Sequence, residues 1–170
     1  GGLMVLDCIA SGTVWVNMRE LSVDILVSAP QKGWSAPAGC ALVMLSPLAL
    51  ERLEATTSSS FAMDLKKWQG IMTSYEQGGH AYYATLPTDV LRSLRDAMQE
   101  MAAHGFDRLR DEQLELGRRV RELLAARGYK SVAAPGFAAP GVVVSYTRDA
   151  ELQSGRAFAR FGIQSAAGVP

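Results

Sequence analysis

A single lysine stands in a long, almost uncharged stretch of this sequence. Between Leu21 and Leu45 only Asp24 and Lys32 carry charge. Burial in a low-dielectric site would disfavour the ammonium form and lower the lysine pKa, and such an amine can attack a carbonyl and form a Schiff base. Because lysines are mostly exposed, a solvated loop lysine is the competing interpretation, and the stretch alone favours it.

A carboxylate and two hydroxyl groups complete the set of side chains that could do chemistry. Asp7 follows the apolar run Leu3–Leu6, and ligands of α/β sheets gather beyond the carboxyl ends of such strands. An aspartate that ends a strand can also serve only as a turn or helix cap, so this role stays open. Tyr82 and Thr85 precede a predicted long helix, where loop packing is the alternative to ligand binding.

Short apolar runs predict the strands that carry these residues, at Leu3–Leu6, Ile25–Ser28 and Ala41–Leu45. Continuous runs of this kind are expected for strands buried on both faces. Ser46-Pro47 then predicts an N-cap and the first position of a short helix that ends near Leu53. A second helix is predicted over 64–72 from the helical spacing of its apolar residues.

Two long helices follow, and a plausible domain boundary lies between them near Gly105. Thr88 is predicted to cap the first helix, which ends at His104, and Gly128 to cap the second, which runs from Phe106 to Arg127. The buried stripe of the second helix is predicted to contain Phe106, Leu109, Leu116, Val120 and Leu123. Beyond it we expect strands at 131–134 and 142–146, a helix over 149–160, and a further strand from Ile163.

Composition excludes several classes of function. The 170 residues suffice for a real core, and equal numbers of acidic and basic residues give no global field for nucleic acid or an anionic membrane. The arginines of the second long helix interleave with acids, which also argues against a nucleic-acid stripe. Cys8 and Cys40 lie in strand-like contexts, as expected of reduced thiols in a cytoplasmic protein. Neither a membrane span, a signal peptide nor metal-ligand spacing at His80 or His104 is found.

The ordered set of these segments resembles the class V aminotransferases, which are fold-type-I pyridoxal phosphate transferases and include the alanine–glyoxylate and serine–glyoxylate enzymes. The resemblance rests on Asp7 in its strand, the pair Gln31-Lys32, the turn Pro37-Ala38-Gly39, the strand Ala41–Leu45 and the segment Tyr82–Pro87. It covers nearly the whole chain in matching order. It implies an α/β fold in which residues 1–105 are the C-terminal part of the cofactor-binding large domain and residues 106–170 a small, truncated α+β domain.

The resemblance also implies a role for each candidate residue. Lys32 would be the catalytic lysine that binds pyridoxal 5'-phosphate, and Asp7 would stand beside its pyridine nitrogen. Ile9 would pack on the ring and Gln31 would reach the phosphate. Tyr82 and Thr85 would bind the phosphate of the neighbouring subunit, so that a homodimer shares its active sites. The family often has histidine near Tyr83-Ala84, and this sequence departs from that pattern.

The implied reaction moves an amino group from a small amino acid to a 2-oxo acid of the glyoxylate or pyruvate type. The chain begins at Gly1-Gly2 directly before a strand and reaches Pro170 without a closing element, so we expect a piece of a longer protein. The glycine-rich phosphate turn would precede Gly1, and the arginine that binds the substrate carboxylate would follow Pro170. We therefore expect the chain alone to bind cofactor poorly and to be inactive.

Two alternatives remain open. A lyase or cysteine desulfurase of the same fold is disfavoured by Gln31, where desulfurases usually have histidine, and by the strand-like contexts of Cys8 and Cys40. A non-catalytic α/β module that binds a partner through its long amphipathic helices is the alternative from a different class.

Overall fold

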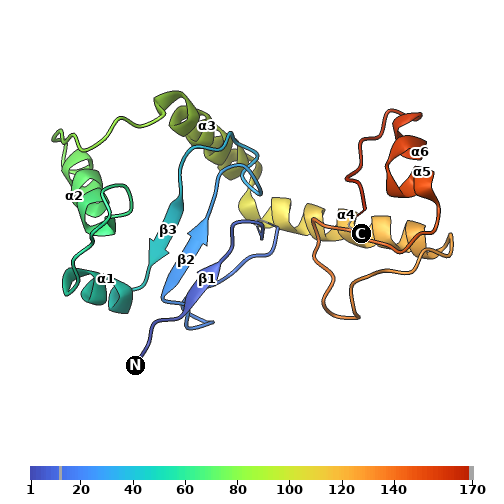
Figure 1. Cartoon of the computed structure of the whole chain (residues 1–170), viewed down its shortest axis with the longest axis horizontal. Helices are drawn as coiled ribbons and strands as arrows, with labels where there is room; N and C mark the ends of the chain where they lie inside the picture. The colour runs from blue at the N-terminus through green and yellow to red at the C-terminus, as the bar shows by residue number, and fades with distance from the viewer. Residues whose placement is uncertain (12, 169–170) are drawn as a thin grey trace. The chain divides into compact units, whose positions relative to one another are not determined.

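The structure is a computed structural model that describes residues 1–11 and 13–168 (Figure 1). Pro170, where we expect the sequence to stop without a closing element, lies outside the described residues. The chain forms two compact units, Gly1–Phe106 and Asp107–Pro170. All six candidate site residues belong to the first unit.

A three-stranded sheet organises the first unit. It consists of β1 (Val5–Asp7), β2 (Ile25–Ser28) and β3 (Leu42–Leu45) in the order β1-β2-β3. β1 runs parallel to β2 with Asp7 opposite Val27, whereas β3 runs antiparallel to β2, as the arrows in Figure 1 show. The middle strand has the predicted bounds, while β1 begins and ends later than predicted, so Asp7 is its last residue rather than the residue after it.

The prediction that the first strand is buried on both faces is wrong for this chain. Val5 is 56% exposed, and β1, which pairs with β2 alone, is an outer strand of the sheet. The buried core lies beside it instead. Cys8, Val23 and Leu26 form a buried cluster, against which Leu6, Val16 and Met18 pack.

Asp24, the second charged residue of the uncharged stretch, ties the sheet to the first helix. Its Oδ2 accepts a hydrogen bond from the backbone N–H of Met4 at 2.8 Å, and its Oδ1 accepts one from Ser46 Oγ at 3.0 Å. The Ser46 N–H also donates to the Asp24 carbonyl at 2.8 Å. One residue thus connects the chain before β1 to the end of β3 and the start of the helix that follows.

Three helices complete the first unit: α1 (Pro47–Glu54), α2 (Leu65–Glu76) and α3 (Thr88–His104). The predicted cap of α1 is confirmed, since Ser46 Oγ accepts a hydrogen bond from the Ala49 N–H at 3.1 Å. Asp64 caps α2 in the same manner. The predicted cap of α3 is wrong: Pro87 occupies the N-cap without a side-chain hydrogen bond, and Thr88 is already helical. The N-cap of α3 is therefore one residue earlier than expected.

α4 (Phe106–Ala125) is the second long helix; it ends two residues before the predicted Arg127, and Gly128 closes it as predicted. Gly128 has φ +83°, its N–H donates to Ala125 O, and the Tyr129 N–H donates to Leu124 O. This pair of bonds is the Schellman arrangement, which glycine favours because it has no Cβ. The predicted buried stripe is wrong in this chain, since Leu116 and Leu123 are 55% and 52% exposed and Phe106 and Val120 are also exposed.

A loop is clamped onto one face of α4. Gln113 Nε2 donates to Pro140 O at 3.0 Å, and the Arg121 guanidinium donates to the carbonyls of Ala139 and Val142. Between these two side chains lies Gly117, the buried residue of the helix, directly against the Pro140 backbone. The three helix positions are four residues apart and so share one face.

The remainder of the second unit is less regular than predicted. No strand forms at 131–134, at 142–146 or from Ile163 within residues 107–168; there is only an isolated antiparallel bridge between Ser131 and Ser145. The predicted helix over 149–160 is divided into α5 (Ala150–Gln153), capped by Asp149, and α6 (Arg156–Ala159). The break occurs at Gly155, whose φ of +79° cannot continue a right-handed helix.

Candidate functional site

The parallel pairing of β1 and β2 places Asp7 and Lys32 at the same end of the sheet, beyond the carboxyl ends of these two strands. Asp7 is the last residue of β1, and Lys32 follows the end of β2 at Ser28 in the next loop. Parallel strands end at one edge, and ligands of α/β folds bind there. Asp7 Oδ1 accepts a hydrogen bond from the Ile9 N–H at 2.9 Å, which orients its carboxylate and sets half-buried Ile9 beside it.

A compact turn presents Lys32 and Gln31. The Ala36 N–H donates to Pro30 O and the Ser35 N–H donates to Lys32 O, both at 3.1 Å. Pro30 is fully buried beneath the turn, and Ser35 has φ +53°, a left-handed conformation that closes it. The neighbouring ring of Trp34 meets Phe106 edge-on, with centroids 6.4 Å apart. The turn is thus fixed at its base while the side chains at its tip point outward.

Lys32 itself is exposed, as is Gln31. The low-dielectric surroundings that the uncharged stretch suggests are therefore not present around Lys32 in this chain. Its amine makes no hydrogen bond or ion pair with any of the residues that the structure describes. The exposed position agrees with the solvated loop lysine that the stretch alone favours.

Tyr82 and Thr85 face each other on the connection between α2 and α3. Tyr82 Oη and Thr85 Oγ1 are hydrogen-bonded at 3.0 Å, and both residues are exposed. Among the described residues, this pair makes no hydrogen bond to Asp7, Gln31 or Lys32. The structure therefore forms two groups of candidates in this chain, one at the sheet edge and one between the helices.

Sequence reasoning missed Tyr83, which lies between Tyr82 and Thr85. Tyr83 Oη donates to Phe61 O at 2.5 Å, and its ring packs against the rings of Phe61 and Trp68, with centroids 4.4 and 5.3 Å away. These three aromatic residues come from separate segments, so their spacing carries no helical or strand period. The available signal was composition, because the segment 61–83 holds several of the aromatic residues of the chain.

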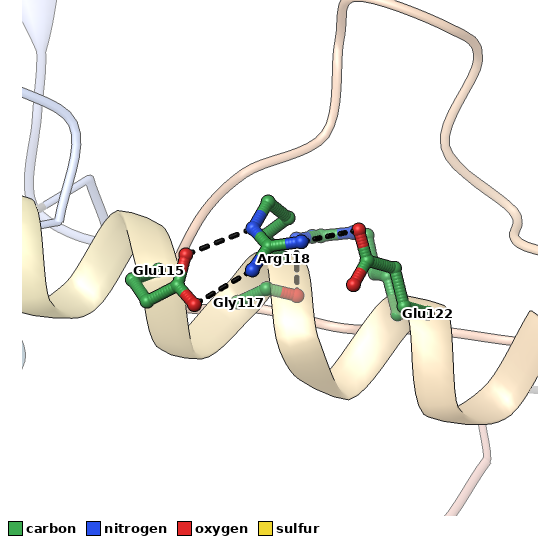
Figure 2. A network of polar contacts seen from close by, with 5 residues as sticks. Glu115, Gly117, Arg118 and Glu122 are labelled. Carbon is green, nitrogen blue, oxygen red and sulfur yellow. Dashed lines mark hydrogen bonds and ion pairs between the residues drawn. The ribbon is translucent and has the colours of Figure 1, made fainter.

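The arginines of α4 are paired with carboxylates. Arg118 bridges Glu115 at 2.7 Å and Glu122 at 2.5 Å, as Figure 2 shows, and Arg108 pairs with Glu112. The hydrogen bonds from Arg118 hold the pKa of Glu115 below its ordinary value, and the bonds to Glu115 and Glu122 raise the pKa of Arg118. This helix face therefore presents balanced charge rather than a basic stripe.

The two cysteines do not lie within strands, contrary to prediction. Cys8 comes directly after β1 and is buried, and half-buried Cys40 lies in the loop before β3. Burial raises the pKa of the Cys40 thiol. A raised pKa reduces the thiolate fraction and hence the nucleophilicity of this side chain at neutral pH.

Within residues 1–11 and 13–168, no cluster of three or more His, Cys, Asp and Glu side chains is arranged to hold a metal ion. The same residues include no helix whose length and apolar character would allow it to traverse a bilayer.

Comparison with known proteins identifies the relatives of the chain. It is 28% identical to the soluble hydrogenase small subunit of a Synechococcus strain over 98% of this chain and 43% of that protein. It is 31% identical to alanine–glyoxylate aminotransferase 1 of Saccharomyces cerevisiae over 66% of this chain and 30% of the enzyme. A serine–glyoxylate aminotransferase of Hyphomicrobium methylovorum is 28% identical over 75% of this chain and 31% of the enzyme. No family model matches the chain.

Solved structures share its fold. An alanine–glyoxylate aminotransferase from Nostoc superposes with a TM-score of 0.84 at 20% identity, over 99% of this chain and 45% of that one. The ureidoglycine–glyoxylate aminotransferase of Bacillus subtilis gives a TM-score of 0.80 at 20% identity, over 99% and 44%. The chain thus spans less than half the length of these proteins.

These comparisons confirm the predicted fold class: the chain has a mixed α/β fold that matches the C-terminal part of these solved aminotransferases. They also confirm the resemblance seen in the sequence. The chain is a relative of the alanine–glyoxylate and serine–glyoxylate aminotransferases.

Proposed function

We propose that this chain is part of a pyridoxal phosphate aminotransferase that moves an amino group from a small amino acid to a 2-oxo acid of the glyoxylate or pyruvate type. The observation that carries the proposal is the position of Asp7 and Lys32 at the ends of two adjacent parallel strands. The aminotransferase relatives support the reaction class. The large-domain and small-domain identities of residues 1–105 and 106–170 belong to the same proposal.

The chemistry of the donor set fits pyridoxal phosphate. The cofactor requires an amine for its aldehyde, a carboxylate for its ring nitrogen and hydrogen-bond donors for its phosphate. Lys32 carries an amine without a partner in the described chain, and Asp7 has a second carboxylate oxygen beyond the one that Ile9 engages. The Gln31 amide and the hydroxyls of Tyr82 and Thr85 are exposed donors.

When bound, the cofactor would supply the protonated ring that accepts the electrons of the deprotonated substrate carbon. Asp7 would hold the proton on the ring nitrogen, because its negative charge favours the protonated form. Lys32 would remove the proton from the α carbon of the substrate as a general base and deliver it to the aldehyde carbon of the cofactor as a general acid. Ile9 would pack against the ring, and Gln31 would bind a phosphate oxygen.

Tyr82 and Thr85 would bind the phosphate of the neighbouring subunit in a homodimer with shared active sites. Their separation from the sheet-edge group in this chain is compatible with that arrangement. We also propose a cytoplasmic location, in keeping with the two free cysteines. The chain alone would bind the cofactor weakly, since it spans less than half the length of its relatives.

Borohydride trapping tests the proposal. The purified chain is incubated with millimolar pyridoxal phosphate, reduced, digested and mapped by mass spectrometry. Lys32 is one of four lysines, with Lys66, Lys67 and Lys130 as internal controls. We expect preferential labelling of Lys32, and we expect Asp7→Asn to reduce that preference. Asp96→Asn, at an exposed carboxylate on α3, is the matched control.

Labelling spread evenly over the four lysines would refute the enzyme proposal and favour the non-catalytic module. If Lys32 is labelled selectively and to the same extent in the Asp7→Asn variant, the role of Asp7 is refuted. A lyase or desulfurase of this fold is the remaining alternative, and the raised pKa of the Cys40 thiol argues against a cysteine nucleophile at that position.

A further inference from the structure

Consecutive residues on the α2–α3 connection face different surroundings. Tyr82 is 74% exposed, whereas Tyr83 is half-buried. A connection that makes no regular structure depends on side-chain contacts for its conformation. The question is what keeps the Tyr82 and Thr85 hydroxyls at hydrogen-bonding distance while both remain exposed.

Tyr83 anchors the connection to the loop before α2. Its hydroxyl donates to the Phe61 carbonyl at 2.5 Å, and its ring lies against the Phe61 ring with centroids 4.4 Å apart. The Trp68 ring meets Tyr83 edge-on at 5.3 Å. Aromatic pairs at these separations are favourable beyond the area they bury.

The surface that receives Tyr83 is itself held in place. Trp68 Nε1 donates to Ala62 O at 2.8 Å, which fastens the loop to the first turns of α2. Asp64 caps the same helix through the Lys67 N–H at 3.1 Å. Tyr83 therefore binds to a fixed platform formed by Phe61, Ala62 and Trp68 rather than to a free loop.

We propose that Tyr83 is a positioning residue for the phosphate-binding pair Tyr82 and Thr85. With Tyr83 bound to the platform, the adjacent Tyr82 is directed outward, and the chain returns at Thr85 so that the two hydroxyls converge on one ligand oxygen. The inference deepens the proposed function and rests on it. Each hydroxyl has one proton, and the bond between them at 3.0 Å uses one of the two, so a ligand oxygen that accepts from both must replace this bond. A phosphate monoester, with several acceptor oxygens, is the ligand class that this pair would bind together with backbone amides.

The first test requires no cofactor. Nuclear Overhauser effects between the Tyr82 ring and the Thr85 methyl group are measured in the purified chain, together with amide hydrogen exchange over 80–86. Tyr83→Ala should abolish the effect and accelerate exchange about tenfold, because it removes a hydrogen bond and two ring contacts. Tyr83→Phe keeps the rings and should retain the effect in part. Tyr146→Ala, at an exposed ring of the second unit, is the matched control and should change neither.

The second test separates positioning from general stability. Lys32 labelling is compared for pyridoxal phosphate and for pyridoxal, which lacks the phosphate. Tyr83→Ala should lower labelling by the phosphorylated compound several-fold and leave labelling by pyridoxal unchanged, whereas a structural loss would lower both. An intact Tyr82–Thr85 contact in Tyr83→Ala, or an unchanged ratio of the two labels, would overturn the inference. Unselective labelling in the unsubstituted chain would instead overturn the proposed function, and the first test would still decide the role of Tyr83.

Discussion

Gly117→Ala tests the packing of the second unit most directly. In an open helix position this substitution stabilises by about 1 kcal/mol, because alanine has the higher helix propensity. At Gly117 an added methyl group would overlap with the Pro140 carbonyl oxygen and lie 3.1 Å from its carbonyl and α carbons. These are backbone atoms, so the loop itself must move.

The cost can be estimated from what that movement disturbs. Overpacking of this kind destabilises by about 1–3 kcal/mol. The Gln113 bond to Pro140 and the Arg121 bonds to Ala139 and Val142 depend on the same loop position, and each bond to a charged donor contributes about 1.5–3 kcal/mol. Subtracting the gain of about 1 kcal/mol in helix propensity leaves a net destabilisation of about 0–2 kcal/mol from overpacking, and any loss of the Arg121 bonds adds to it.

Gly70→Ala provides the matched control. Gly70 lies inside α2, and a methyl group there has open space around it, so the substitution should stabilise the first unit by about 1 kcal/mol. Urea unfolding followed by far-UV circular dichroism measures both variants, and native-state hydrogen exchange of the α4 amides assigns the effect to the second unit. If Gly117→Ala stabilised the chain as Gly70→Ala does, the close approach of Pro140 to α4 would be refuted.

Two further predictions concern caps and pH. Ser46→Ala should destabilise the first unit by about 1–2 kcal/mol, because Ser46 both caps α1 and binds Asp24, while Ser59→Ala in the exposed loop should have little effect on the urea midpoint. Arg118 lowers the pKa of Glu115 in the folded state. The stabilisation that this pair gives to the folded state is therefore present above the pKa that Glu115 has when unfolded, and it is lost as pH falls through the folded pKa. Helicity of the second unit should therefore decline slightly in mild acid, and Glu115→Gln should reduce that decline; an equal decline in both proteins would contradict the pairing.

Local signals in the sequence predicted the elements well. Ser46-Pro47 predicted the start of α1, and Gly128 predicted the glycine cap that closes α4. The apolar run Ile25–Ser28 predicted β2 with the bounds that the structure has. The two helix ends depend on a few adjacent residues and their backbone geometry, whereas β2 also needs the partner strands β1 and β3. The candidate site was predictable only as far as the parallel strands bring Asp7 and Lys32 to one edge, and their roles stay predictions.

Contacts between distant segments could not be predicted. The aromatic platform for Tyr83 joins residues 61, 68 and 83, and the clamp on α4 joins Gly117 to Pro140. Neither contact produces a periodic pattern, since one partner in each lies on an irregular loop. The strands expected at 131–134 and 142–146 failed for a related reason: a short apolar run can extend without finding a partner strand, and here only one bridge forms.

The errors about burial all have the same direction. Val5, Leu116 and Leu123 are exposed where the sequence predicts burial, and no residue predicted to be exposed is part of the buried cluster around Leu26. An apolar pattern reflects burial in the whole folded protein, and the relatives of this chain are more than twice its length. β1 and the exposed stripe of α4 are therefore the two places where the apolar pattern exceeds the burial that this chain provides.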